Sequence, residues 1–158
     1  MRVPELRKER GLPTHRPAVS GFATPHMANS LNAPVRIRPV TVLLADDAEF
    51  ARNAVKAFSE ASRKIELVGE AHNFPQTLAM CSELKPCVVS LDLHMPGEAL
   101  EPRHVKSKLL GGSKFVIAMC TWNDEPARAL ASRYGAMALL DKTQLASKLI
   151  PAIRAATG

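Results

Sequence analysis

Polar residues that could take part in catalysis or in metal binding follow four short apolar runs of this 158-residue chain. They are Asp46 and Asp47, Asp92, Cys120 and Thr121, and Asp141 and Lys142. If the runs are parallel strands, these residues follow the carboxyl ends of the strands and share one rim of the sheet, where such folds place their binding sites. We therefore expect the four sets to form one site.

Three carboxylates, those of Asp46, Asp47 and Asp92, meet at this predicted rim, and they repel one another unless a cation compensates. A few oxygen ligands, completed by water and phosphoryl oxygens, describe a Mg²⁺ site rather than a zinc or copper site. An ammonium from Lys142 would hold a phosphoryl oxygen as a point charge. Taken singly, an Asp-Asp pair is more often a helix cap, and a lone Asp or Lys after a strand is a turn or solvated residue. Their joint placement favours the functional interpretation.

Alternating strands and helices must position these residues. We predict strands at residues 40–45, 65–68, 87–91, 114–119 and 136–140, because these runs are short, apolar and rich in β-branched residues. Each is followed by apolar residues at helical spacing, as in Ala51, Ala54, Val55 and Phe58. Short buried strands joined by helices imply right-handed crossovers and a parallel sheet covered on both faces. The fold class is therefore α/β, a doubly wound five-stranded parallel sheet.

Local signals set the expected helix ends. Asn73 is a candidate N-cap for a helix that stops at Lys85-Pro86. A weaker helix around Val105 and Leu109 is expected to end at Gly111-Gly112, and another, over residues 124–134, is expected to end at Gly135.

The first 39 residues differ from the rest. They carry seven Lys/Arg, two Asp/Glu and six of the twelve prolines, without periodic apolar positions. We predict a disordered, basic, Pro-rich extension at 1–39 and a folded domain at 40–158. Three alternatives stay open: an arm for nucleic acid or acidic partners, a transit peptide, or translation that begins at Met27.

The cysteine pattern and the hydropathy of the chain indicate its cellular compartment. Cys81, Cys87 and Cys120 form no metal-binding or disulfide pattern, and no stretch approaches the ~18 apolar residues of a membrane span. We expect a cytoplasmic protein that binds neither membrane nor, directly, nucleic acid.

Three segments carry a family resemblance that spans essentially residues 40–156. Leu43–Asp47, Val88–Gly97 and Gly135–Lys142 are similar to the receiver domain of two-component response regulators. That resemblance implies a flavodoxin-like (βα)5 fold that takes a phosphoryl group from a histidine kinase or a phosphotransfer protein onto an aspartate.

Residue by residue, the resemblance assigns roles. It makes Asp92 the phosphoacceptor and Lys142 the contact to the phosphoryl group. It also makes Asp46, Asp47 and Asp92 ligands of Mg²⁺, completed by the main-chain carbonyl of His94. The sequence departs from the family at Cys120 and Leu139, where most members have Ser or Thr and an aromatic residue; Thr121 stands one position late. The usual switch is therefore in question at Cys120 and Thr121.

The resulting expectation is a phosphorelay response regulator of the single-domain type, without an attached output domain, that signals to a downstream protein. We do not expect an enzyme beyond self-directed phosphotransfer and autodephosphorylation. Two alternatives stay open: a degenerate receiver that docks partners without phosphorylation, and an aspartyl-phosphate phosphatase of the haloacid dehalogenase type, whose Asp-x-Asp motif is absent after the first strand.

Overall fold

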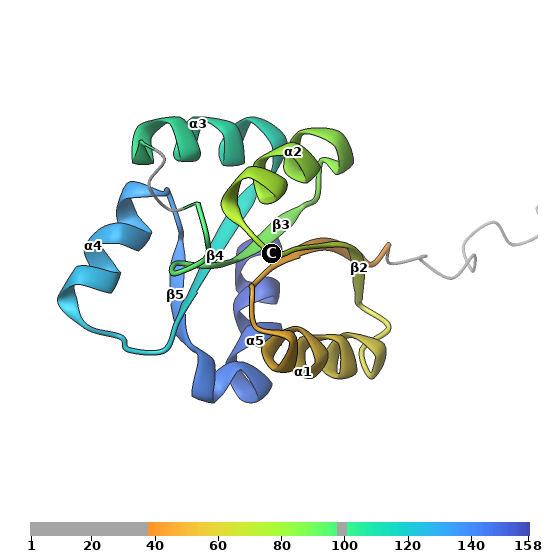
Figure 1. Ribbon diagram of the computed structural model, residues 1–158. Helices are drawn as coiled ribbons and strands as arrows, with labels where there is room; N and C mark the ends of the chain where they lie inside the picture. The colour runs from red at the N-terminus through yellow and green to blue at the C-terminus, as the bar shows by residue number, and fades with distance from the viewer. Residues whose placement is uncertain (1–37, 98–100) are drawn as a thin grey trace, which may run out of the picture. The chain divides into compact units, whose positions relative to one another are not determined.

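The computed structural model describes residues 38–97 and 101–158, which contain one five-stranded parallel sheet (Figure 1). The strand order is β2-β1-β3-β4-β5. The strands are β1 Val40–Ala45, β2 Ile65–Ala71, β3 Val88–Asp92, β4 Phe115–Cys120 and β5 Ala138–Asp141. This order confirms the predicted doubly wound, flavodoxin-like fold, in which the chain reverses direction across the sheet between β1 and β3.

Two groups of helices cover the two faces of the sheet (Figure 1). They are α1 Glu49–Glu60 and α5 Leu145–Thr157 on one face, and α2 Phe74–Leu84, α3 Pro102–Gly112 and α4 Glu125–Arg133 on the other. A 3-10 turn, Lys142–Gln144, joins β5 to α5. Alternate residues of each strand serve the two faces, so that Val42 packs with Val55 and Leu149, whereas Leu43 packs with Phe74.

Local chemistry accounts for most helix starts. The Asn73 side chain accepts a hydrogen bond from Gln76 N, which confirms the predicted cap of α2. Asp124 caps α4 in the same way through Ala127 N. Proline stands in the first turn of α2, α3 and α4, where its missing N–H leaves no helical bond unmade.

Helix α3 ends at Gly112, which confirms the predicted end at Gly111-Gly112. Both glycines are its last helical residues, and the C-cap is Ser113 in an extended conformation. Gly112 is needed for packing, because a Cβ there would lie 2.5 Å from the carbonyl oxygen of Cys81. The second strand is longer than predicted, since its backbone pairing with β1 continues through Ala71.

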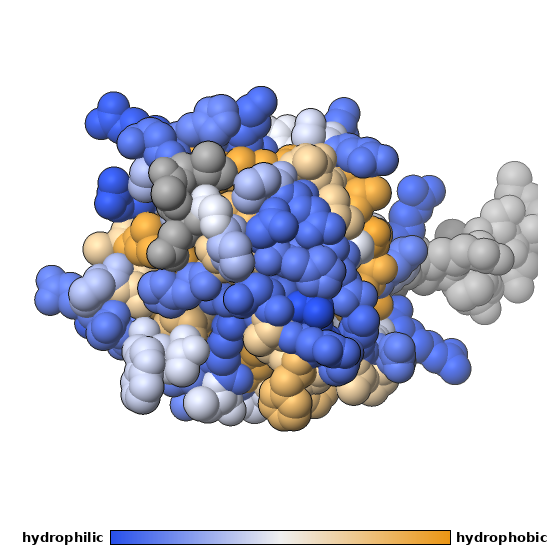
Figure 2. All heavy atoms as spheres, in the orientation of Figure 1, coloured by the Kyte–Doolittle hydropathy of each residue, from blue (hydrophilic) through white to orange (hydrophobic). Residues whose placement is uncertain are grey.

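Exposed apolar side chains are scattered over the described surface. Phe50 and Trp122 are 87% and 76% exposed. On the face drawn in Figure 2, hydrophilic residues predominate and hydrophobic residues form separate small groups. No helix in residues 38–97 and 101–158 has the length and apolarity to cross a bilayer. Apart from Arg38 and Pro39, the predicted N-terminal extension lies outside the described residues.

Candidate functional site

Asp46 lies in the turn after β1, and three hydrogen bonds hold it. Its N–H donates to Ala71 O at 3.0 Å, its carbonyl oxygen accepts from Arg52 Nη1 at 2.9 Å, and its Oδ1 accepts from Ala48 N at 2.9 Å. Because the residue is fully buried, desolvation raises the pKa of its carboxyl, against the opposing effect of Lys142. Oδ2 is left to face the site.

Asp92 is the last residue of β3 and is 3% exposed. Its Oδ1 accepts a hydrogen bond from His94 N at 3.1 Å, which ties the carboxylate to the loop that follows. That loop turns at Gly97, whose φ of +88° favours glycine, and a Cβ there would lie 2.7 Å from Pro75 Cδ. The strand end and the turn together aim the Asp92 carboxylate at the rim.

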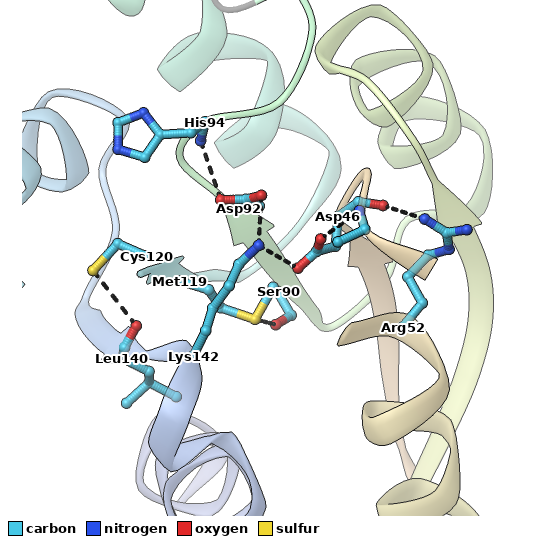
Figure 3. A network of polar contacts seen from close by, with 10 residues as sticks. Asp46, Arg52, Ser90, Asp92, His94, Met119, Cys120, Leu140 and Lys142 are labelled. Atoms are coloured by element: carbon cyan, nitrogen blue, oxygen red, sulfur yellow. Dashed lines mark hydrogen bonds and ion pairs between the residues drawn. The ribbon is translucent and has the colours of Figure 1, made fainter. Parts of the chain in front are cut away.

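Lys142 reaches this rim from the turn after β5 and joins two carboxylates (Figure 3). Its Nζ lies 2.7 Å from Asp92 Oδ2 and 2.8 Å from Asp46 Oδ2. Burial alone would lower the pKa of Lys142, but the contacts of its ammonium with the Asp46 and Asp92 carboxylates together outweigh burial and raise the pKa. The ammonium is therefore charged at neutral pH and partly balances the two carboxylates.

The three carboxylates fit a divalent cation. One oxygen from each of Asp46, Asp47 and Asp92 lies within 4.8 Å of the others. Two of these groups are buried, whereas Asp47 is exposed. The buried Asp46 Oδ2 has the ion pair with Lys142 but no well-aligned hydrogen bond. An all-oxygen set of this kind, open to water on one side, suits Mg²⁺.

The remaining residues of the predicted site lie apart from this cluster or have other contacts. Cys120 is buried, and its thiol donates to Leu140 O at 3.7 Å (Figure 3). Burial, and then the carboxylates of Asp141, Asp124 and Asp92, raise the pKa of that thiol. Thr121 is exposed.

Asp141 is a local cap rather than a partner of the other carboxylates. Its Oδ1 accepts from Thr143 N at 2.7 Å and from Thr143 Oγ1 at 2.6 Å. These bonds lower the pKa of the Asp141 carboxyl.

Two contacts behind the site were missed from the sequence. Arg52 donates to the main chain of Asp46, and Ser90 Oγ donates to Met119 Sδ at 3.0 Å beneath the rim (Figure 3). The spacing between Asp46 and Arg52 gave a weak signal, since a side chain in the first turn of a helix can fold back over the preceding loop. No pattern in the sequence indicated the second contact.

Curated relatives are response regulators and related proteins. The transcriptional regulatory protein LiaR of Bacillus subtilis is 33% identical over 119 residues, 75% of this chain and 56% of LiaR. The nitrate/nitrite response regulator protein NarL of Escherichia coli is 33% identical over 96 residues, 58% of this chain and 44% of NarL. The chain thus spans about half the length of these relatives. No family model matches the chain.

Solved structures agree with this match. The response regulator domain of Thermotoga maritima CheB superposes with a TM-score of 0.65 at 26% identity, covering 75% of this chain and 96% of that domain. The receiver domain of a NarL regulator from Mycobacterium tuberculosis has a TM-score of 0.62 at 22% identity, covering 74% of this chain and 98% of that domain, and shares the fold. In sequence and in fold, the described part of this chain is similar to the receiver domains of two-component response regulators.

Proposed function

We propose that the domain at residues 40–158 accepts a phosphoryl group on Asp92 from a phosphohistidine of a histidine kinase or phosphotransfer protein, with Mg²⁺ as cofactor. The observation that carries this proposal is the position of Asp92, whose Oδ2 lies 2.7 Å from the Lys142 ammonium beside two further carboxylates. A lone strand-end aspartate would need neither the ammonium nor the acidic pair.

Phosphotransfer would proceed by in-line displacement. An oxygen of the Asp92 carboxylate forms the new P–O bond while the P–N bond to the donor imidazole breaks, and the imidazole keeps the electron pair. Lys142 is placed to move its ammonium from the Asp92 carboxylate to a phosphoryl oxygen. Asp46, Asp47 and Asp92 would hold Mg²⁺, with the main-chain carbonyl of His94. When bound, Mg²⁺ would neutralise charge on the transferred phosphoryl group.

The output of this reaction is a change of charge at the rim. The acyl phosphate carries up to about two negative charges where the Asp92 carboxylate carried one, and it places phosphoryl oxygens beside β4 and β5. We propose that this change is read by a downstream protein in the cytoplasm, not by nucleic acid or a membrane. Hydrolysis of the acyl phosphate would reset the signal.

A second candidate is a docking module that acts without phosphorylation. Cys120 and Leu139 favour a docking module, because the weakly donating thiol of Cys120 is bonded to Leu140 O and Leu139 is packed against the core. In that case the acidic cluster and Lys142 would only stabilise the rim.

Intact-mass measurement after treatment with acetyl phosphate and Mg²⁺ separates the two candidates. We expect a labile gain of one phosphoryl group, about 80 Da, that is lost in Asp92→Asn and when EDTA replaces Mg²⁺. Asp141→Asn is the matched control, because Asp141 is also a strand-end carboxylate but bonds only within its own turn. Retention of the adduct in Asp92→Asn would refute the assignment, and no adduct on the wild type would favour the docking module.

A further inference from the structure

Arg52 contacts the Asp46-Asp47 pair, and the proposed phosphotransfer does not use it. Its Nη1 donates to the carbonyl oxygen of Asp46 at 2.9 Å, and its side chain is only 11% exposed. Figure 3 shows the guanidinium reaching back from α1 to the end of β1, on the opposite side of Asp46 from Lys142.

Glu70 of β2 holds this guanidinium in place. Glu70 Oε2 lies 3.5 Å from Arg52 Nε, and Glu70 Oε1 lies 2.7 Å from Lys56 Nζ. Arg52 and Lys56 are one helical turn apart on α1 and share the same carboxylate. Only Arg52 also reaches Asp46.

The Arg52 bond completes the fixation of Asp46. Its N–H is held by Ala71 and its Oδ1 by Ala48, so the carbonyl is the remaining polar main-chain group of this residue. Because Asp47 follows directly, the peptide plane that Arg52 holds also determines where the exposed Asp47 carboxylate starts. Removing the guanidinium would free this plane to rotate.

We propose that Arg52, oriented by Glu70, is a positioning residue that sets the Asp46-Asp47 pair in the geometry needed for a divalent cation. The inference rests on the proposed function for its biological use, while the contact itself stands on the distances above. An electrostatic role and a positioning role of Arg52 predict opposite changes in Mg²⁺ affinity when the side chain is removed. Removing a cation near three carboxylates should tighten Mg²⁺ binding if charge alone matters, and weaken it if Arg52 positions the pair.

The test measures Mg²⁺ affinity by calorimetry in the full chain. Arg52→Met should weaken binding by about tenfold, the lower end of the effect of outer-shell partners on metal sites. Glu70→Gln should weaken it less, and Arg52→Lys should lie between Met and wild type. Lys56→Met is the matched control, since Lys56 binds the same Glu70 and makes no contact with Asp46; it should leave the affinity at or slightly above that of the wild type.

Amide NMR shifts in EDTA test the same contact without metal. Arg52→Met should move the amide signals of Asp47 and Ala48 more than Lys56→Met does, with the rest of the spectrum retained as proof of folding. Unchanged or tighter Mg²⁺ binding in Arg52→Met, or equal amide shifts in the two variants, would overturn the inference. The proposed function is judged separately, by Mg²⁺ binding and phosphorylation of the wild type, and the NMR comparison decides on Arg52 even if the wild type takes no phosphoryl group.

Discussion

The ammonium of Lys142 lies 2.7 Å from Asp92 Oδ2, and the two residues come from strand ends that are not neighbours in the sheet. The lysine also pairs with the fully buried Asp46. It therefore occupies the place where a bound cation would compete for the same oxygens. If Mg²⁺ binds here as proposed, it would neutralise the same acidic cluster as Lys142.

Replacing Lys142 by Met should make the domain depend on Mg²⁺ for stability. In EDTA at neutral pH we expect a loss of about 2 kcal/mol in the free energy of unfolding, less than for a fully buried pair because the Lys142 side chain is 17% exposed. Mg²⁺ should raise the thermal midpoint more in this variant than in the wild type, since the competing ammonium is gone. Lys148→Met, at an exposed position of α5, is the control. Equal Mg²⁺-induced rises would mean that Lys142 does not compete with the metal.

Asp46→Asn should stabilise the metal-free domain as the pH rises. Burial raises the folded-state pKa of Asp46 above its ordinary 3.8, so ionisation of this carboxyl opposes folding. The penalty is absent well below pH 3.8, grows as the pH rises through that value towards the raised pKa, and persists at neutral pH. Urea unfolding in EDTA at pH 3 and pH 7 should therefore show a gain for Asp46→Asn over wild type only at the higher pH.

Asp141→Asn supplies the opposite sign as a control. The Thr143 hydrogen bonds lower the folded-state pKa of Asp141 below 3.8. Its carboxylate therefore contributes stability above that pH, which is lost as the pH falls through the lowered pKa. This variant should be less stable than wild type at neutral pH and approach it in acid. The same pH trend in both variants would contradict the opposite pKa shifts of Asp46 and Asp141.

The sequence could predict the strands and the acidic cluster because both follow from strand chemistry. Apolar runs such as Val40–Ala45 are buried wherever the sheet places them, and the residues after parallel strands must share one rim. The convergence of Asp46, Asp92 and Lys142 needed no more information than this.

Other features depend on contacts that no local pattern encodes. The bond from Arg52 to Asp46 arises from how α1 lies against β2, where Glu70 holds the guanidinium. Strand β2 extends past its apolar residues because main-chain pairing with Leu44 and Ala45 does not require apolar side chains. Likewise, the two glycines indicated where α3 ends, but no local pattern indicated that Gly112 packs against the main chain of Cys81.

Those two glycines should respond oppositely to alanine. At Gly112 a Cβ would lie 2.5 Å from Cys81 O and 2.9 Å from Cys81 Sγ, so Gly112→Ala should destabilise by about 2 kcal/mol as the helices move apart. At Gly111 no atom lies within 4 Å of the added Cβ, and alanine should stabilise by about 0.5 kcal/mol through helix propensity. Urea unfolding of both variants measures the difference. Equal effects would show that α2 and α3 are less closely packed than these distances require.

Cys120→Ser should strengthen the coupling between the rim and the loop that begins at Thr121. The buried thiol donates weakly to Leu140 O at 3.7 Å, and a serine hydroxyl, on a shorter bond to Cβ, would sit farther from that carbonyl if the strand stays in place. The hydroxyl would then be free to donate to a phosphoryl oxygen on Asp92. We expect the NMR shifts that beryllofluoride induces at residues 122–125 to become larger in Cys120→Ser.

Thr121→Val is the matched control. Because Thr121 is exposed, the shifts that beryllofluoride induces in this variant should equal those of the wild type. Loss of the shifts in Thr121→Val would place the switch at Thr121, and no change in either variant would direct the signal elsewhere, most simply through the loop at His94–Gly97 that is bonded to Asp92 Oδ1.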